Sequence, residues 1–264
     1  MTKCLQCNNT KRFWRLKDGR LRCSVCRKSF TLKKKLPRLN KRIVKKVISE
    51  FVLEHSTNTI LERVNISKYK LLKLLILLRI VMTKDVPDIF SGIVEVDETY
   101  LGGQMKNRKQ KDRIKYGKNR RGFGTIKQPV FGILCREGKI FAEIVPDTEA
   151  RDLQPLIEKQ VSKGSTICSD TWRGYTKFAS KGYVHRLVDH SKKEYSNKKG
   201  NHINGLEGFW GYLKRKLAAK GGIRQQRLPL YLGEYVWRYN HRNQNFKEQE
   251  KRLFMLLNQH LRSE

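Results

Sequence analysis

The stretch GIVEVDETYLGG (92–103) decides the fold that this 264-residue sequence predicts. Apolar residues run up to Asp97, so the pattern predicts a buried strand that ends at Asp97 and leaves its carboxyl group at the edge of a sheet. Side chains alternate along a strand, so Glu95 shares the face of Asp97 while Glu98 points to the other face. We therefore expect Asp97 to be the metal-binding acid of this stretch, with Glu95 at most behind it.

The residues that follow predict a regular alternation of strands and helices. The predicted strands are PVFGILCR (129–136), KIFAEIVP (139–146), STICSD (165–170), which ends on Asp170, and YVHRLVD (183–189). The predicted helices are ARDLQPLIEKQVSKG (150–164), a short one near 173–181, and HINGLEGFWGYLKRKL (202–217). Three strands, a helix, a strand, a helix, a strand and a helix is the element order of an α/β (α+β) fold of ribonuclease-H-like type, a mixed sheet with flanking helices.

Three carboxylates in this order suit a divalent-metal site. In the predicted sheet the first and fourth strands are neighbours, so Asp97 and Asp170 can meet and Glu207 must arrive from the last helix. Carboxylates suit Mg²⁺ or Mn²⁺, and two ions roughly 3.5–4 Å apart can stabilise both the attacking and the leaving oxygen of a phosphodiester displacement. Trp210 and Lys214 follow Glu207 at i+3 and i+7 on one helix face, where Lys214 could grip a DNA phosphate.

Other residues near this constellation leave alternatives open. Trp210 can pack under the site or contact DNA. Glu234 is an alternative third acid, and Arg238 on the same helical stretch is either solvated or phosphate-facing.

Four cysteines near the start of the chain form two C-x-x-C pairs, Cys4 with Cys7 and Cys23 with Cys26, with 15 residues between the pairs. This spacing is typical of a zinc ribbon, in which two tight turns aim four thiolates at one ion. All four ligand positions are filled by cysteine, so we expect one structural Zn²⁺ without catalytic work. A redox or disulfide role is the alternative.

The interval KRFWRLKDGRLR (11–22) predicts a β-hairpin that turns at Asp18-Gly19. Apolar and basic residues alternate on both sides of the turn, as in a short half-buried strand pair. The small core of this hairpin is predicted to contain Phe13, Trp14, Leu16 and Leu21.

Between about residues 37 and 90, apolar residues recur every three or four positions, which predicts helices. Ser67 is a good N-cap for the longest of them, KYKLLKLLILLRIVM (68–82). A short helix, a turn and a longer helix is the outline of a helix-turn-helix, whose second helix enters the major groove of DNA. Lys68 and Lys70 then lie where base or phosphate contacts fall. A plain structural bundle shares this outline and is the alternative.

The charge of the chain is large and uneven, with 58 Lys and Arg against 24 Asp and Glu and a net charge of +34. Residues 1–90 hold 23 basic and 6 acidic side chains, and residues 106–121 hold 9 basic and one acidic. Such a charge favours a polyanionic partner, most commonly nucleic acid. We expect the basic insertion 104–124 to clamp DNA near the metals through Arg108, Lys109, Arg120 and Arg121; a disordered basic loop is the alternative.

Composition and hydropathy exclude several classes of protein. With 38% hydrophobic and 31% charged residues the chain can form a core, so it is not a disordered tail. Its longest apolar stretch (71–82) is well short of the roughly 20 residues of a bilayer span, and no secretory signal is evident. We expect a cytoplasmic, nucleoid-associated protein with no membrane partner. The predicted domains are a zinc ribbon (1–35), a helical, helix-turn-helix-like DNA-binding segment (36–90) and a ribonuclease-H-like catalytic domain (91–250).

Four motifs together resemble a known family. VDETYLGG (96–103), SDTWRGY (169–175), HINGLEGFWGYLKR (202–215) and EYVWRYNHR (234–242) are similar to motifs of the DDE transposases of prokaryotic insertion sequences. The resemblance is to their ISXO2-like, zinc-ribbon branch, which is related to eukaryotic Merlin elements, and it covers nearly the whole chain. It implies that Asp97, Asp170 and Glu207 are the metal-binding triad and that Lys214 is the basic residue seven positions after the acid.

The resemblance also implies an activity and partners. A transposase of this kind uses two Mg²⁺ (or Mn²⁺) ions per active site to cut DNA at the element ends and to transfer the strands into target DNA. Its partners are the double-stranded terminal repeats and the target, and it works as a homodimer or a larger synaptic complex. The alternatives are a catalytically silent, domesticated DNA-binding repressor, a junction-type nuclease of the same fold, and an RNA- or ribosome-associated basic protein.

Overall fold

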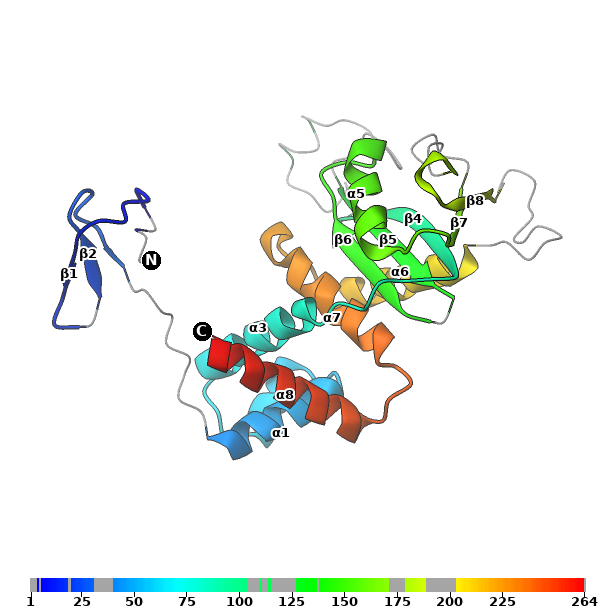
Figure 1. Ribbon diagram of the computed structural model, residues 1–264. Coiled ribbons are helices and arrows are strands. Elements are labelled where there is room, and N and C mark those ends of the chain that lie inside the picture. The colour runs from blue at the N-terminus through cyan, green and yellow to red at the C-terminus, as the bar shows by residue number, and fades with distance from the viewer. Residues whose placement is uncertain are drawn as a thin grey trace.

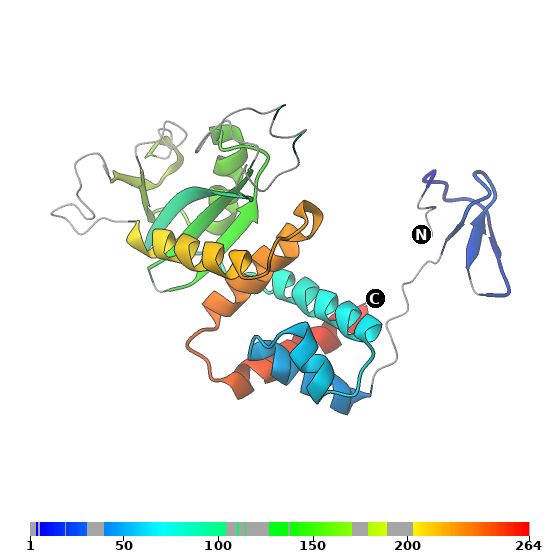
Figure 2. The same ribbon diagram turned by 180° about the vertical axis from the view of Figure 1, so that it is seen from behind.

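The computed structural model describes residues 4, 6–18, 20–30, 40–103, 110, 114, 127–136, 138–170, 179–188 and 203–263. Figures 1 and 2 show these residues from opposite sides as a small three-stranded unit, a helical bundle and a larger sheet flanked by helices. Within these ranges, no helix combines the length and the apolar character that crossing a bilayer requires.

The larger sheet contains five strands in the order β6-β5-β4-β7-β8. β4 (Ile93–Leu101), β5 (Gln128–Cys135) and β6 (Ile140–Ile144) pair antiparallel, whereas β7 (Thr166–Ser169) and β8 (Val184–Leu187) continue from β4 in parallel. The first and fourth of these strands are thus neighbours, and the mixed sheet confirms the predicted α/β fold of ribonuclease-H-like type. Two single-turn 3₁₀ helices precede β8 and α7, namely η3 (Ala179–Lys181) and η5 (Gln225–Arg227).

β4 is longer than the sequence predicts. Its predicted end was Asp97, but the strand continues to Leu101 because the residues up to that point pair with β5. On its other side, β4 pairs with β7 only as far as Glu95, which lies opposite Cys168. Asp97 therefore lies inside its own strand but just beyond the paired part of its parallel neighbour.

Helices cover both faces of this sheet (Figures 1 and 2). α5 (Ala150–Gln160) packs on the face that contains Val96, and α6 (Asn204–Ala218) packs on the face that contains Leu101. Alternation along β4 places Asp97 on the same face as Leu101. The side chain of Asp97 therefore faces the layer that contains α6.

The helical bundle begins with three helices that have side-chain caps. α1 (Lys41–Val52), α2 (Thr57–Arg63) and α3 (Lys68–Lys84) follow Asn40, Ser56 and Ser67, and each of these cap side chains accepts a backbone hydrogen bond from the first turn that follows it. Such caps satisfy N–H groups that have no partner within the helix. The cap predicted at Ser67 is present, and a short turn links α2 to α3.

The bundle is completed by a C-terminal helix that was not predicted from the sequence. α8 (Phe246–Ser263) packs against α1 and α3, and its Leu253 and Leu257 lie in the same apolar core. The predicted boundary at residue 250 falls inside this helix. The bundle is therefore built from segments that lie more than 150 residues apart in the sequence.

α7 (Leu228–Asn240) belongs to both the bundle and the sheet. Its Trp237 is buried in the core of the bundle, whereas Leu232 lies in the core between the sheet and α6. α7 crosses α3 so closely at Gly233 that a Cβ there would lie 2.1 Å from Cγ2 of Thr83. Only a residue without a side chain fits this crossing.

Buried ion pairs lie beside the same crossing. Glu234 is 2% exposed and pairs with Arg79 of α3 at 2.7 Å and with Arg238 at 3.1 Å. Arg238 also donates hydrogen bonds to the carbonyl oxygens of Phe51 and Val52 in α1. Arg238 is thus neither solvated nor phosphate-facing. Glu234 lies at the crossing of α3 and α7, where its negative charge is balanced by Arg79 and Arg238.

The small unit contains β1 (Phe13–Arg15), β2 (Leu21–Cys23) and β3 (Ser29–Phe30) in an antiparallel sheet, and it lies apart from the rest in both views. The predicted hairpin is present. Trp14, however, is 47% exposed and is not part of the core. Alternation puts it on the outer face opposite Arg22, while Phe13 packs against Phe30.

The β6 edge of the larger sheet is covered by side chains from the end of α7. The amide of Asn240 makes two hydrogen bonds of 2.8 Å with Ile140, one from its backbone N–H and one to its carbonyl oxygen. Arg242 donates a single hydrogen bond to the carbonyl oxygen of Gly138, in the turn just before β6. At Ile140 the Asn240 amide thus takes the place of the backbone of a further strand.

Candidate functional site

The pairing of β4 with β7 brings the two predicted aspartates together. Ile93 pairs with Thr166 and Glu95 with Cys168, so each residue of β4 lies opposite the residue 73 positions later. The same shift places Asp97 opposite Asp170, which directly follows the last residue of β7. Neighbouring strands are about 4.8 Å apart, so the two acids lie side by side where the paired part of β7 ends.

Trp210 of α6 holds one oxygen of Asp97. Its indole N–H donates a hydrogen bond of 3.0 Å to Oδ2, and the ring is only 4% exposed. The ring lies against Gly132, which pairs with Asp97 in the register of β5, and a Cβ at Gly132 would lie 2.6 Å from it. With its edge bonded to Asp97 and its surface buried, the indole presents little surface to DNA, so its position is explained by packing under the site.

Glu207 is exposed on the first turn of α6, three residues before Trp210. It is close enough to influence Asp97 electrostatically. Burial raises the pKa of Asp97 to about 7, and the negative charges of Asp170 and Glu207 raise it further, against hydrogen bonds from the backbone of Glu98 and from Trp210. The three predicted acids therefore form one electrostatic cluster.

Lys214 lies one helical turn beyond Trp210 on α6 and faces the same region. Partial burial lowers its pKa, Lys127 lowers it further, and the nearby charge of Asp97 acts in the opposite direction. A lysine that is influenced by Asp97 and still exposed can contact a phosphate beside the carboxylates. Lys127, just before β5, was not predicted and adds a second cation here.

The three acids fit divalent cations by donor type and by charge. Their carboxylates offer only oxygen ligands, and the pKa of Asp97 is raised chiefly by burial and further by the charges of Asp170 and Glu207, which a nearby cation would offset. Their oxygens do not all lie within 4.8 Å of one another, since among the described residues only four cysteines form such a group.

The cysteine group consists of Cys4, Cys7, Cys23 and Cys26, the four predicted ligands. Sγ of Cys4 lies 3.6 Å from Sγ of Cys26, and Cys7 and Cys23 are separated by the same distance. Zn–S bonds of about 2.3 Å in a tetrahedron put the sulfurs roughly 3.8 Å apart, so the cluster can hold a zinc ion. No ligand position is left for a substrate, which indicates a structural site.

The two C-x-x-C turns have the same backbone conformation. Asn8 and Arg27, the residues directly after each pair, have φ values of 57° and 59°. Their N–H groups donate hydrogen bonds of 3.1 Å to the carbonyl oxygens of Cys4 and Cys23. Asn tolerates this left-handed conformation, so its position was a usable signal in the sequence; Arg does not favour it and gave none.

The predicted DNA contacts are partly described. Lys68 and Lys70 are exposed at the start of α3, where a recognition helix makes its contacts. Between them Tyr69 is 66% exposed, with Nζ of Lys73 4.3 Å from its ring centre. Arg108, Lys109, Arg120 and Arg121 lie outside the described residues.

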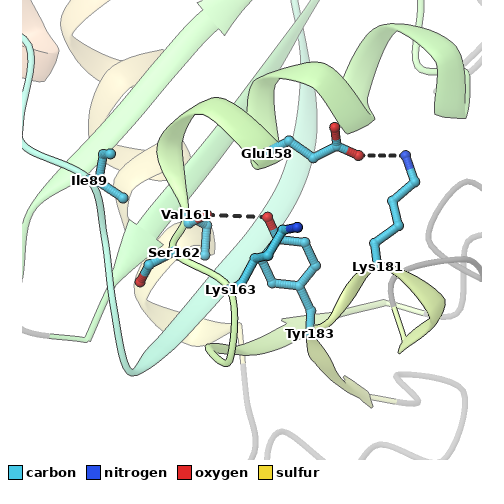
Figure 3. A pocket seen from close by; sticks show the side chains of 7 residues that line it. All are labelled: Ile89, Glu158, Val161, Ser162, Lys163, Lys181 and Tyr183. Atoms are coloured by element: carbon cyan, nitrogen blue, oxygen red, sulfur yellow. Dashed lines mark hydrogen bonds and ion pairs between the residues drawn. The ribbon is translucent and has the colours of Figure 1, made fainter.

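A separate pocket of about 630 Å³ lies elsewhere on the sheet domain (Figure 3). It is lined by residues around the end of α5 and the starts of β7 and β8, where Tyr183 donates to the carbonyl oxygen of Val161 and Lys181 pairs with Glu158. Asp170 follows the other end of β7. The pocket is therefore distant along the strand from the carboxylates, and its one acid is already paired.

Comparisons with known proteins agree with this geometry. Residues 89–240 match the family model described as the ISXO2-like transposase domain, a span that contains Asp97, Asp170 and Glu207. A protein of Haemophilus influenzae, described as an uncharacterized transposase-like protein, is 33% identical over 111 residues, which are 42% of this chain and 87% of that protein.

Proposed function

Because this chain belongs to the ISXO2-like transposase family, we propose that it is an active transposase that cuts DNA at element ends and joins these ends to target DNA. The proposal is supported by the register of β4 and β7, which pairs Glu95 with Cys168 and, continued by two residues, brings Asp97 next to Asp170; the charge of Glu207 also acts on Asp97. A protein that only binds DNA has no need of this costly acidic cluster.

In the proposed site, Asp97, Asp170 and Glu207 hold two Mg²⁺ or Mn²⁺ ions. Ions held there would stabilise negative charge on the attacking and leaving oxygens of the phosphodiester. Trp210 keeps the Asp97 carboxylate oriented through its indole N–H. Lys214 binds a phosphate next to the scissile one and so aligns the DNA strand.

The proposed reaction has two steps. A water oxygen attacks the phosphorus at the element end, the bond from phosphorus to the 3′ oxygen breaks, and that oxygen leaves as a 3′-hydroxyl. The 3′-hydroxyl then attacks a target phosphodiester, forms the new bond and releases a 3′-hydroxyl of the target strand. Joining two ends to one target calls for a homodimer or a larger synaptic complex.

We assign DNA binding to the basic parts of the chain. Lys68 and Lys70 are proposed to contact the terminal repeat from α3, with the zinc ribbon (1–35) and the basic insertion (104–124) neutralising further phosphates. The helical unit (36–90) together with α8 then forms the DNA-binding body, and the sheet with α5 to α7 forms the catalytic one. Binding should weaken steeply with salt because cation release drives it.

The test uses the full chain, duplex DNA from the flanks of its gene, and Mg²⁺. Wild type should cut at the element end, and Asp97→Asn should lower the cutting rate at least a hundredfold while the Kd for the duplex stays within about twofold. Lys70→Ala is the matched variant with the opposite pattern: weaker binding at low DNA concentration, and near-normal cutting once the DNA is saturating.

The outcomes distinguish the candidate functions. Asp97→Asn cutting as fast as wild type would overturn the assignment of Asp97. Specific duplex binding by wild type without any cutting would favour the repressor, and cutting of branched DNA without joining would favour a junction nuclease.

A further inference from the structure

Glu95 is a buried acid for which the proposed reaction has no direct use. It is 1% exposed and lies on β4 two residues before Asp97, on the same face. Its Oε2 accepts a hydrogen bond of 2.9 Å from the backbone N–H of Leu206 in the first turn of α6. A carboxylate from the sheet thus contacts the helix that contains Glu207.

Within the part of the chain that the structure describes, the start of α6 has no side-chain cap. Its N-cap residue, Ile203, is buried and makes no side-chain capping bond, whereas α1, α2 and α3 are capped by Asn40, Ser56 and Ser67. The first turn of a helix needs acceptors for its N–H groups and attracts negative charge. The carboxylate of Glu95, on the neighbouring sheet, supplies both a hydrogen-bond acceptor and a negative charge.

The contact is close and specific. A Cβ at Gly205 would lie 3.0 Å from Oε2 and 3.4 Å from Oε1 of Glu95, so glycine lets the helix end come down onto the carboxylate. Nε of Arg136 lies 3.8 Å from Oε1 and balances the charge from the other side. Glu95 is therefore engaged by protein groups and is not placed as a ligand for the metals.

Two attachments of α6 to β4 match each other in spacing. Glu95 holds Leu206, and Asp97 is held by Trp210, so two positions of the strand bind two positions of the helix in the same direction. Four helical residues rise about 6 Å, and two strand residues rise about 6.6 Å. Glu207 lies between the two attachment points, next to the first.

From this geometry we infer that Glu95 is a positioning residue, which fixes the first turn of α6 on β4 and thereby sets Glu207 relative to Asp97. The inference rests on the proposed function, because the position of Glu207 matters only if Glu207 holds a metal. Removal of the attachment leaves both acids in place but lets the helix end move against the strand. Metal binding and turnover are then impaired while DNA binding is not.

The first experiment measures backbone amide hydrogen exchange in the protein without added Mg²⁺ or Mn²⁺. In Glu95→Ala, the amides of residues 204–208 should exchange about tenfold faster than in wild type, since a lost cap frays the first turn. Glu95→Gln retains an acceptor oxygen and should lie between the two. Leu153→Ala, a cavity variant under α5 on the opposite face, controls for general destabilisation and should leave these amides unchanged relative to the rest of α6.

The second experiment measures cutting of saturating element-end duplex against Mg²⁺ concentration. Glu95→Ala should lower kcat by about tenfold to a hundredfold and raise the Mg²⁺ concentration for half-maximal rate, with KM for DNA nearly unchanged, because small misplacements of catalytic groups are costly. Glu95→Gln should recover part of both. Leu153→Ala should cut at the wild-type rate at a temperature where it is folded.

A gentler pair of substitutions covers the case in which Glu95→Ala does not fold. Gly205→Ala brings a methyl group against the carboxylate, whereas Gly208→Ala in the same helix meets no atom within 4 Å. Both gain helix propensity, so Gly208→Ala should raise Tm and Gly205→Ala should raise it less or lower it. Equal shifts would count against close contact with Glu95.

The inference is overturned if the amides of residues 204–208 exchange alike in wild type and Glu95→Ala, or if Glu95→Ala has the wild-type kcat and Mg²⁺ dependence. Failure of the proposed function is recognised separately. In that case wild type itself shows no Mg²⁺-dependent cutting, while the exchange experiment still decides whether Glu95 holds α6.

Discussion

At the scale of single residues, the surroundings of Asp97 disfavour the ionised carboxylate that binding a metal ion would require. Burial and the charges of Asp170 and Glu207 raise its pKa from an ordinary value of 3.8 to about 7. Without a cation, the folded state must either keep a proton on Asp97 or accept an ionised carboxylate in a place that disfavours it. Asp97 should therefore lower the stability of the metal-free protein at neutral pH.

Asp97→Asn should consequently stabilise the metal-free protein, and by an amount that grows with pH. Well below pH 3.8 the carboxyl group is protonated in the folded and unfolded states alike, so the charge makes no difference. Between pH 4 and 7 the unfolded chain releases the proton while the folded chain retains it, so wild type loses stability relative to the variant as pH rises. We expect the variant to be more stable by about 1–3 kcal/mol at pH 8 and by little at pH 4.5.

Urea unfolding of both proteins at the two pH values, without added Mg²⁺ or Mn²⁺, measures this difference. Adding Mg²⁺ at pH 8 should stabilise wild type more than Asp97→Asn. A stability difference that is the same at both pH values would contradict the assigned cause.

The sequence patterns indicated where the acidic residues lie better than they indicated which residues pack against them. Asp97 and Asp170 each follow an apolar run, and both end up at the meeting point of β4 and β7. The packing of Trp210 on Gly132 and the contact of Glu95 with Leu206 join residues from different layers. Local patterns contain no information on such pairs, because only the folded layers bring them together.

At the scale of elements, the small N-terminal sheet with its four cysteines has little apolar surface to hold it together. Its strands contain only two or three residues each, and its buried apolar side chains are few. Small units of this size depend on a metal for stability. The sequence could predict the ligands because their spacing is local, but not the exposure of Trp14, which depends on the hairpin register.

Purified protein should contain about one zinc ion per chain, held by the four N-terminal cysteines. Cys23→Ser should lose most of the zinc and make residues 4–30 susceptible to protease, while the thermal transition of the remaining body is unchanged. Cys135→Ser, a similar change at a buried cysteine of β5, is the control and should retain the zinc. Metal analysis and limited proteolysis measure both effects; full zinc retention in Cys23→Ser would contradict the cluster.

At the scale of the whole molecule, α7 locks the helical bundle to the sheet. Gly233 lets α7 meet α3 at Thr83, and Glu234 pairs there with Arg79. Asp85 at the end of α3 also pairs with Arg252 of α8 and accepts from Trp237. If α3 holds the terminal repeat, this junction fixes the distance from the bound sequence to the carboxylates.

Gly233→Ala should make the distance between the bound DNA sequence and the carboxylates less well defined. The added Cβ must push α3 and α7 apart, which we expect to cost about 1–3 kcal/mol. At a temperature where the variant is folded, its cuts should spread over neighbouring nucleotides, as read on a sequencing gel. Thr83→Ala in addition removes the methyl group at 2.1 Å and should restore most of the stability and a single cut position.

Gly208→Ala, which adds the same methyl group in open space on α6, is the control for that experiment. A single, unshifted cut position in a destabilised Gly233→Ala would show that the junction does not set the spacing. The sequence patterns led us to divide the chain into three consecutive parts, but α8, more than 150 residues after α3, packs against the first helices. Periodicity detects a helix and not its distant partner, so the shared bundle could not be foreseen.

The side chains at the β6 edge limit how copies of the chain can associate. A free edge strand offers unpaired backbone groups to another strand, a common route to aggregation. Asn240 and Arg242 already occupy such groups on Ile140 and Gly138. Among the described residues, β8 is the strand at the other edge of the sheet, and its Val184 is 49% exposed. A further strand that approached β6 at Ile140 would therefore have to displace the Asn240 amide.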